Sequence, residues 1–516
     1  MKLKHYGLII IPVIIISQIM IVPERTKSEY IPQAISKNEI AYYWAPVWDQ
    51  DTYSSDFEAD YITKFDYDGN WIGNDNWNNF GSYPLNATIY YSILETETHW
   101  FIGYYDYHPR DWSETGLFQH ENDMEGVLIV VKKDGTDWGQ FYCMITEAHT
   151  NFYQYIDYET PASANLTDNY DDIDGDVEFE TVNNYYLNFN FSSHAHPIAY
   201  VDAKGHGVYG DKRWEDSDFP DNDGVIYKPM GKSEEPLSGN DRNVSYALTS
   251  IEVLWERRYG PYGSGQTFGS FSAFDGDDYG EDKANPPWSW DDSDDGPTYS
   301  GEIFYNPADV IATHFGNLGS FNHTYLSNPY AFQLRIDRFR VNWDLDDEGD
   351  YSDGYFNLYM FHSDGKPTQL DGVLDGDDGS QYTWIGENMI TGEWLEMHDE
   401  IPRPLYGIHY PDRPYFGINC KEWDEFTPDP WLMDKTRTHW YGPTGTSRYE
   451  GKKVIVIDVG QSLLDWEGAE VYLTINVILG NFTSVEVSLP KVVYFLPIVT
   501  LVNLAILIIR KKKIAK

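Results

Sequence analysis

Short runs rich in Tyr, Val, Ile and Phe alternate with clusters of Asp, Gly, Asn and Pro through most of the chain. Aromatic and β-branched residues favour strands, and turn residues at this spacing are typical of an all-β sandwich. Asp134 and Gly135 form a hairpin-turn signal between two of the runs. The runs are Ala87–Leu94, Gly126–Lys132, Phe141–Thr146, Tyr185–Phe191 and Pro197–Asp202. We therefore predict an all-β protein, in which Val244–Arg257 suits either a helix or a strand.

A second group of strand-like runs follows a segment rich in Pro, Gly, Asp and Trp at residues 275–296, which we interpret as a long acidic loop. The second group comprises Gln333–Val341, Gly354–Phe361, Lys453–Val459 and Glu470–Val477. We predict a β-sandwich domain over residues 38–325, then a second β-sandwich-like domain of unknown role over residues 331–486.

The chain is strongly acidic, with 83 Asp and Glu against 36 Lys and Arg and a formal net charge of −47. This charge excludes a nucleic-acid-binding protein, which needs a basic face to displace counterions from phosphates. Aromatic residues make up 16% of the chain, so it can fold around a core despite the charge. The acids either form a solvated surface or bind cations.

The two ends differ from the acidic body. An apolar run at residues 8–22 follows two lysines, so residues 1–28 suit a signal peptide or an N-terminal anchor. Residues 492–509 carry no charge and reach the lower length limit of a transmembrane helix, and a basic tail follows at 510–516. We predict a single-pass protein of the cell membrane, with the body exported to the cell surface and the C-terminus cytoplasmic. The alternative for 492–509 is a buried core helix.

Two further features fit an exported body. Cys143 and Cys420 either form a disulfide or are two buried thiols. Six Asn-x-Ser/Thr sequons predict a glycosylated surface. The asparagines are Asn86, Asn165, Asn190, Asn243, Asn322 and Asn481.

The most informative chemistry lies in residues 104–126, YYDYHPRDWSETGLFQHENDMEG. His120, Asp123 and Glu125 follow the spacing H-x-x-D-x-E, and Asp111 ends the preceding strand-like run. These side chains meet if the two strands are neighbours, because residues two apart on a strand share a face. Three carboxylates and one imidazole favour Ca²⁺, Mg²⁺ or Mn²⁺ over Zn²⁺. The alternative is a set of ordinary polar loop residues.

This segment resembles the core of the necrosis- and ethylene-inducing protein family, the necrosis-inducing toxins. In that family a tyrosine-rich strand ends in P-K-D and precedes G-H-R-H-D-W-E-G; here the equivalents are Pro109-Arg110-Asp111 and His120–Gly126. The later Glu147-Ala148-His149 is similar to the family's S-A-H. The segments Pro197–Asp202 and Gly205-His206-Gly207 also resemble a block of the vacuolar-protein-sorting-like family. The resemblance covers about residues 40–210.

The resemblance implies a β-sandwich that binds a divalent cation through Asp111, His120, Asp123 and Glu125, and the mostly oxygen ligands make Ca²⁺ or Mg²⁺ the expected ion. It also implies glycan or glycolipid head groups as partners, because the family binds glycosylated sphingolipids at host membranes. The chain departs from the motif at Gln119, Asn122 and Met124, where the family has Gly, His and Trp. The resemblance therefore implies the cation rather than the toxin activity.

Other polar side chains could line the same cavity. His149 stands at the S-A-H position, and His206 is the histidine of the later block. Glu95, Glu97 and His99 alternate along one strand, where they either add a second polar cluster or face solvent at a sheet edge.

Two more sites are hypotheses. Asp66, Asp68 and Asn70 start like a calcium loop, although Trp77 stands where an EF-hand has Glu. Trp288 and Trp290 in the acidic loop either stack on sugars or hold the loop against the domain.

These patterns favour a cell-surface binding protein that recognises glycan or glycolipid head groups through a cation. One alternative is a metal-dependent phosphoester or glycoside hydrolase with His149 or His120 as general base. Another is a structural cell-envelope protein stabilised by calcium. The sequence contains no Gly-rich phosphate loop, G-x-S-x-G or H-E-x-x-H motif, so nothing supports nucleophilic catalysis.

Overall fold

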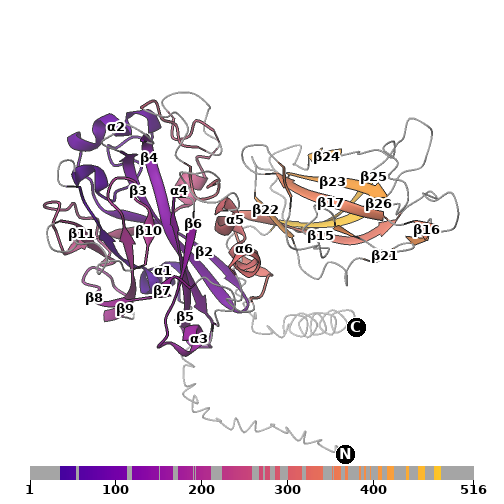
Figure 1. The fold of residues 1–516 in the computed structure, drawn as a ribbon, viewed down its shortest axis with the longest axis horizontal. Coiled ribbons are helices and arrows are strands. Elements are labelled where there is room, and N and C mark those ends of the chain that lie inside the picture. Colours follow the sequence, from indigo (N-terminus) through magenta and orange to yellow (C-terminus); the bar gives the residue numbers. More distant parts are fainter. Residues whose placement is uncertain are drawn as a thin grey trace, which may run out of the picture. The chain divides into compact units, whose positions relative to one another are not determined.

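The computed structural model describes the chain from residue 35 to the strand that ends at Val477, with gaps (Figure 1). The described residues are 35–53, 57–112, 119–149, 151–164, 166, 173–189, 191, 193–210, 223–258, 266–270, 273–278, 285–290, 300–315 and 321–340, followed by the strands between 351 and 477. The predicted leader (1–28), membrane helix (492–509) and basic tail (510–516) lie outside them. No helix in the described part of the chain is long and apolar enough to cross a membrane.

The first region is built from two sheets. The larger sheet has the order β13 (Ala247–Ser250), β2 (Thr88–Thr96), β3 (His99–Asp111), β4 (His120–Lys132), β5 (Gln140–Ala148), β6 (Asn151–Ile156) and β7 (Gly175–Asp176), with β14 (Tyr325–Ser327) also on β2. The smaller sheet has the order β10 (Val208–Tyr209), β9 (Ser193–Val201), β1 (Val47–Gln50), β11 (Val225–Lys228) and β12 (Val244–Ser245), with β8 (Phe179–Asn183) also on β9.

The two sheets pack on each other through apolar side chains. Ala148 at the end of β5 packs against Tyr200 of β9 and Tyr209 of β10. On the smaller sheet, Val47 and Ile198 form a second buried cluster. Burial of such side chains is the main stabilising contribution to the fold.

Helices in the described residues are short. They are α1 (Lys37–Trp44), α2 (Asn76–Asn79), α3 (Pro161–Ala164), α4 (Glu252–Trp255), α5 (Ser300–Tyr305) and α6 (Pro307–His314), with 3-10 turns at Phe57–Asp60, Gly73–Asp75 and Phe80–Ser82. Helices of eight residues or fewer depend on tertiary packing, because an isolated helix needs about 12–15 residues to be even marginally stable.

The second region is also made of strands. One sheet has the order β21 (Leu395–Glu396), β15 (Ala331–Arg340), β26 (Glu470–Val477) and β25 (Gly451–Asp458), with β22 (Leu405–Ile408) on β15. Another has the order β18 (Pro367–Gln369), β17 (Gly354–Phe361), β23 (Tyr415–Glu422) and β24 (Arg437–Trp440), with β19 (Thr383–Trp384) on β17; β16 (Tyr351–Ser352) pairs with β20 (Met389–Ile390).

The prediction of an all-β chain is confirmed for the described residues, and so is the turn at Asp134 and Gly135 between β4 and β5. The strand predicted at Tyr185–Phe191 is wrong. Tyr185 and Tyr186 lie in a turn after β8, where the backbone N–H of Tyr185 bonds the carbonyl of Asn183. The ambiguous segment Val244–Arg257 contains both states, because β12 and β13 precede the short helix α4.

Of the two alternatives for the cysteines, the structure supports the thiol for Cys143, which is free and buried within β5. Burial raises the pKa of this thiol, so it is an unreactive core residue. Of the sequons, Asn165, Asn190 and Asn481 lie outside the described residues, whereas Asn86, Asn243 and Asn322 lie within them.

Candidate metal centre

Strands β3 and β4 form one long antiparallel pair with two chemically different halves. In the apolar half, Trp100 to Tyr105 pair with Gly126 to Val131. In the charged half, Asp106 to Asp111 pair with His120 to Glu125. Both halves are buried along almost their whole length. Burial of apolar side chains stabilises a fold, whereas burial of carboxylates and imidazoles costs free energy unless they are paired.

The charged half contains a compact four-residue patch. Asp106 lies opposite Glu125, and His108 lies opposite Asp123. Residues directly opposite each other, and residues two apart on one strand, project from the same face of a sheet. Their exposed fractions are 0% for Asp106, 0% for His108, 3% for Asp123 and 1% for Glu125. Three carboxylates and one imidazole therefore share one buried face.

At the ends of the strands, Asp111 lies opposite His120. The Nε2 atom of His120 lies 3.8 Å from Oδ2 of Asp111. The Nδ1 atom of His120 lies 2.9 Å from the carbonyl of Asn122. A carbonyl only accepts, so Nδ1 carries the proton and Nε2 presents a lone pair beside Asp111. Metal-binding histidines are typically held in this way.

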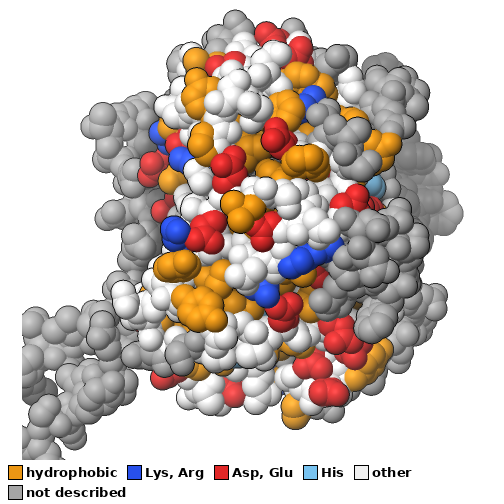
Figure 2. Space-filling view, turned by 90° about the vertical axis from the view of Figure 1, so that its left-hand side faces the viewer, with side chains coloured by type: hydrophobic (Ala, Val, Ile, Leu, Met, Phe, Trp, Pro, Cys, Tyr) orange, Lys and Arg blue, Asp and Glu red, His pale blue; other side chains and the backbone are white. Residues whose placement is uncertain are grey.

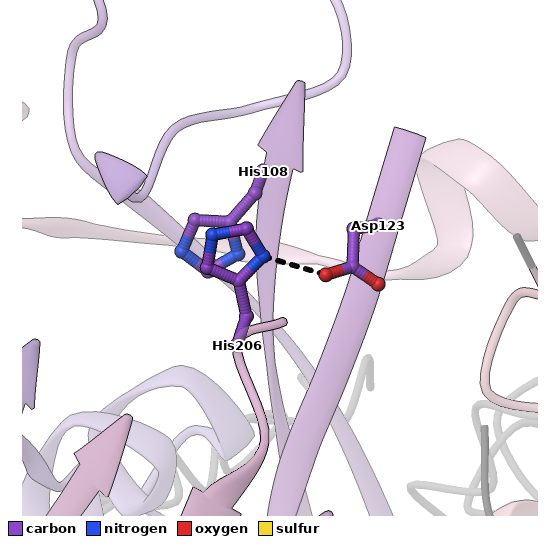
Figure 3. Close-up of side chains that lie close together, drawn as sticks. All are labelled: His108, Asp123 and His206. Atoms are coloured by element: carbon purple, nitrogen blue, oxygen red, sulfur yellow. Dashed lines mark hydrogen bonds and ion pairs between the residues drawn. The ribbon is translucent and has the colours of Figure 1, made fainter. Parts of the chain in front are cut away.

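His206 reaches the patch from the loop between β9 and β10 and lies between two carboxylates. Its Nδ1 donates to Oδ2 of Asp123 at 2.6 Å (Figure 3). Its Nε2 lies 3.4 Å from Oδ1 of Asp60. Burial alone would lower the pKa of His206, but the two carboxylates raise it to about 10. Burial alone would raise the pKa of Asp123, but His206 more than offsets this and lowers it. Below that pH, His206 is a buried imidazolium.

His108 stacks face to face on His206, with ring centroids 3.6 Å apart and planes 5° apart (Figure 3). Its Nε2 lies 3.0 Å from Oε1 of Gln50, a residue of β1 in the other sheet. The amide nitrogen of Gln50 donates to two carbonyls, those of Asp51 and Asp202, which leaves Oε1 as the acceptor. Burial, and then the charge of His206, lower the pKa of His108, so this ring is neutral.

The acids around these histidines outnumber their cationic partners. Burial raises the pKa of Asp106 to about 7, and neither of its carboxylate oxygens accepts a hydrogen bond from another residue. Burial also raises the pKa of Glu147, and the charges of Asp123 and Asp106 raise it further. A buried carboxylate must be paired, protonated or bound to a metal, so the charged half has the chemistry of a cation site.

Residues with strained backbone conformations lie around the charged half. In the described residues four non-glycine residues have positive φ: Asn122 (61°), His149 (52°), Lys204 (76°) and His206 (49°). A Cβ atom added to Gly205 would lie 3.1 Å from Cε1 of His149 and 3.8 Å from Oδ2 of Asp111, so the loop 202–207 contacts both. Such conformations cost about 1–3 kcal/mol each, and they cluster at functional sites.

The structure pairs Asp111 with His120 at the strand ends and places Asp123 and Glu125 further along β4, opposite His108 and Asp106, so it groups the predicted ligands differently. Among the described residues, two groups have ligand atoms that all lie within 4.8 Å of one another: His108 with Asp123 and His206, and Glu121 with Asp277 and Asp278. Asp123 belongs to both the predicted set and the first group. Asp60, Asp106 and His108 were not predicted from the sequence. Asp106 and His108 are two apart on one strand, so their D-x-H spacing could have indicated that both side chains share a face.

The second group is held together by the backbone. Glu121 accepts from the backbone N–H groups of Trp77 and Asp277 at 2.7 and 3.0 Å, which uses both of its oxygens. Asp278 accepts from Asn78 at 2.8 Å. These contacts account for the cluster without a ligand.

Three predicted cavity residues lie at the opposite end of β3. His99 is 2% exposed and packs against Tyr142 and Phe321. Glu95 forms an ion pair with Lys133 at 2.6 Å, and Glu97 lies exposed in the turn between β2 and β3. The prediction that these three share the cavity is therefore wrong. Of the predicted cavity residues, His149 and His206 do lie at the candidate centre.

The predicted calcium loop is held by its own side chains. Asn70 donates from its backbone N–H and its side-chain amide to Asp68, at 3.0 and 2.6 Å. Asp66 pairs with Lys64 at 3.2 Å. Asparagine and lysine donors thus satisfy these carboxylates, and calcium binding here stays a prediction.

Trp288 and Trp290 are 0% and 3% exposed, so neither presents a face to a sugar, and the stacking hypothesis is wrong. The Nε1 atom of Trp290 donates to the carbonyl of Met124 in β4 at 3.0 Å. Trp288 packs against Trp255 and Phe304. The two rings hold the segment 285–290 against the larger sheet.

No family model and no curated protein matches the sequence. Comparison with solved structures finds NLP proteins, the family that the motifs resemble. "NLPPya in complex with glucosamine" is 12% identical with a TM-score of 0.18, and "NLPPya in complex with mannosamine" is 14% identical with a TM-score of 0.18. Each match covers 39% of this chain and 62% of the other. "Crystal structure of non-toxic HaNLP3 protein" is 16% identical, covers 35% of this chain and 75% of the other, and has a TM-score of 0.17. These scores are too low to carry an argument about fold or function.

Proposed function

We propose that the first β region binds a divalent cation through the outer ligand set, Asp111, His120, Asp123 and Glu125, and uses it to recognise glycan or glycolipid head groups. The observation that supports the proposal is the pairing of Asp111 with His120 at 3.8 Å, with the other histidine nitrogen held by a carbonyl. A hard cation favours this carboxylate-rich set, so Ca²⁺ or Mg²⁺ is the proposed ion.

The cation would act as the contact between protein and ligand. A divalent ion held at a strand end keeps coordination positions for hydroxyl or phosphate oxygens of a head group. Exposed His149 and the half-buried Asp111 lie at this edge of the centre. Because the sequence ends predict an exported, anchored body, we propose binding at the cell surface.

The acidic side chains on the surface differ from those of the buried candidate centre. Figure 2 shows acidic side chains spread across one face, between hydrophobic and uncharged ones, with few basic side chains. Dispersed solvated acids give solubility by mutual repulsion and bind cations only weakly. The specific ion is therefore proposed for the buried centre.

Calorimetry of the full chain with Ca²⁺ and with Mg²⁺ tests the proposal. The variant Asp111→Asn with Glu125→Gln should lose specific binding of the ion. The matched control, Glu58→Gln with Glu97→Gln, removes the same charge from exposed positions and should keep it. Equal cation binding by both variants would refute the outer ligand set.

Sugar binding is tested in a second arm. Glucosamine and mannosamine are added to the cation-loaded chain and to the chain in EDTA. We expect binding only with the cation. If the cation binds but neither sugar does, the cation site stands and recognition of these amino sugars fails.

A further inference from the structure

Three separate segments of the chain meet at Asp60, a buried carboxylate that does not belong to the outer ligand set. Asp60 ends a 3-10 turn and is 0% exposed. Its Oδ2 accepts the backbone N–H of Tyr53 at 2.7 Å. Its Oδ1 accepts the backbone N–H of Lys204 at 2.8 Å and the indole N–H of Trp112 at 3.3 Å. The same Oδ1 faces His206, so one side chain joins residue 53, the residue after β3 and the loop 202–207.

The loop 202–207 has a conformation that depends on such contacts. Lys204 and His206 have positive φ, at 76° and 49°. Residues other than glycine keep such conformations only where the surrounding structure compensates for their cost. Asp60 contacts both of these residues, through a hydrogen bond in one case and an ion pair in the other. It is therefore placed to hold the loop in its strained form.

The loop and Trp112 both adjoin Asp111, a proposed ligand. Trp112 directly follows Asp111, and its backbone N–H donates to the carbonyl of Lys204 at 3.2 Å. On the other side, a Cβ atom added to Gly205 would lie only 3.8 Å from Oδ2 of Asp111. Asp60 thus fixes the residue that follows Asp111 and also the loop that packs against its carboxylate.

We propose that Asp60 is a positioning residue that acts through Trp112 and the loop 202–207 to hold Asp111 beside His120. The inference rests on the proposed function, because it names the residue that keeps part of the outer ligand set in its binding arrangement. In this role Asp60 is not itself a ligand of the cation.

Side-chain packing joins the partners of Asp60 into one unit. The Nζ atom of Lys204 lies 3.4 Å from the centre of the Tyr53 ring and 5.5 Å from that of Trp112. The two rings meet edge to face, with centroids 5.4 Å apart. Attraction between an ammonium group and aromatic faces stabilises such a cluster. Removal of the Asp60 carboxylate should therefore disturb all three partners together.

Two variants of the full chain test the proposal. Asp60→Asn keeps the shape of the side chain, but its amide nitrogen cannot accept a hydrogen bond, so at least one backbone N–H loses its acceptor. Thr52→Val is the matched control from the same segment. Thr52 is 2% exposed, and its hydroxyl donates to the carbonyl of Gly239 at 2.8 Å and accepts the N–H of Gly224 at 3.0 Å. Neither partner belongs to the loop 202–207.

The first measurement is calorimetry with Ca²⁺. Loss of a contact that orients a metal ligand typically weakens metal binding by about 10- to 100-fold, and we expect a loss of this size in Asp60→Asn. Thr52→Val should keep the affinity of the unchanged chain, although it too loses buried hydrogen bonds. Equal Ca²⁺ affinity in the unchanged chain and in Asp60→Asn would overturn the positioning role.

The second measurement needs no cation. Hydrogen exchange in EDTA, followed by mass spectrometry of peptides that cover residues 108–112 and 202–207, reports how firmly these segments are held. Asp60→Asn should exchange about 10-fold faster in both peptides, and Thr52→Val should not. Unchanged exchange in Asp60→Asn would overturn the proposal. If the unchanged chain binds no Ca²⁺, the proposed function fails, and the exchange result still decides whether Asp60 holds the loop.

A milder variant covers the case in which Asp60→Asn does not fold, as judged by circular dichroism. Trp112→Phe keeps an aromatic ring and removes only the indole N–H that donates to Asp60. Loss of one such hydrogen bond should weaken Ca²⁺ binding by about 2- to 10-fold. Unchanged Ca²⁺ affinity in this variant would overturn the positioning role.

Discussion

The two halves of the β3–β4 pair have the same register and nearly the same burial but opposite chemistry. Phe101, Ile129 and Val130 in the apolar half are all 0% exposed, as are Asp106 and His108 in the charged half. In the first case loss of contact with water stabilises the fold; in the second it costs free energy that must be recovered by pairing or by a ligand. Burial alone therefore does not distinguish core from site, whereas burial together with residue type does.

The largest expected effect on stability comes from the apolar half. Phe101→Ala removes a fully buried ring that packs against Phe321 and Tyr325, so the free energy of unfolding should fall by about 3–5 kcal/mol. Cation stoichiometry should not change. Urea unfolding and metal analysis measure the two effects, and loss of metal in the folded variant would show that the halves are not independent.

A change in the charged half should have a different signature. Asp123→Asn leaves the His206 imidazolium with Asp60 as its remaining carboxylate, and removal of one partner from a buried ion pair costs about 3 kcal/mol or more. We expect lower stability in EDTA together with loss of cation binding. Urea unfolding with and without Ca²⁺ checks this. If Ca²⁺ stabilises Asp123→Asn as much as the unchanged chain, Asp123 is not a ligand.

The junction between the halves is Gly126. A Cβ atom added there would lie 2.5 Å from the carbonyl oxygen of Tyr104 and 2.8 Å from the ring of Tyr105, so Gly126→Ala should cost about 1–3 kcal/mol. Gly175→Ala is the control, because its Cβ atom would make only ordinary contacts, the nearest at 3.4 Å. Thermal unfolding of both variants measures the difference. Equal thermal unfolding midpoints for Gly126→Ala and Gly175→Ala would show that β3 and β4 can move apart at Gly126 without a loss of stability.

The smallest expected effects are two pH dependences of stability with opposite sign, one from His99 just beyond the apolar half and one from Asp106 in the charged half. Burial, followed by the charges of Lys132 and Lys133, lowers the pKa of His99 to about 4 from 6.5, so the unfolded chain binds more protons and stability should rise with pH between these values. The pKa of Asp106 is raised to about 7 from 3.8, so its contribution to stability should fall with pH over that range.

Urea unfolding in EDTA between pH 4 and 7 measures both contributions. His99→Asn should remove the rising contribution, and Asp106→Asn should remove the falling one. Slopes that change in the same direction in both variants would contradict the assignment.

Local sequence patterns predicted much of this pair of strands. Short runs rich in apolar and β-branched residues, separated by the Asp134-Gly135 turn, predicted β4 and β5, and the spacing of His120, Asp123 and Glu125 placed charges next to β4. Local patterns of this kind depend on neighbours along the chain, which a sequence displays directly.

The remainder depended on tertiary structure. His206 and Asp123 are 83 residues apart, and Asp60 joins them from a third segment, so no spacing rule could have grouped them. The burial of Trp288 and Trp290 follows from their contact with the larger sheet, which the acidic composition of their segment concealed. Tyr185 and Tyr186 have high strand propensity, yet the turn after β8 determines their conformation.

The long separation between His206 and its partners has a kinetic consequence. The imidazolium can reach Asp123 and Asp60 only after the loop between β9 and β10 has closed onto the larger sheet, and such non-local contacts form late because chain closure costs entropy first. Until then the acids of the charged half remain hydrated and repel one another. We expect the apolar half to pair in the folding transition state, with the centre assembling afterwards, so that substitutions of His206 accelerate unfolding while leaving the folding rate nearly unchanged.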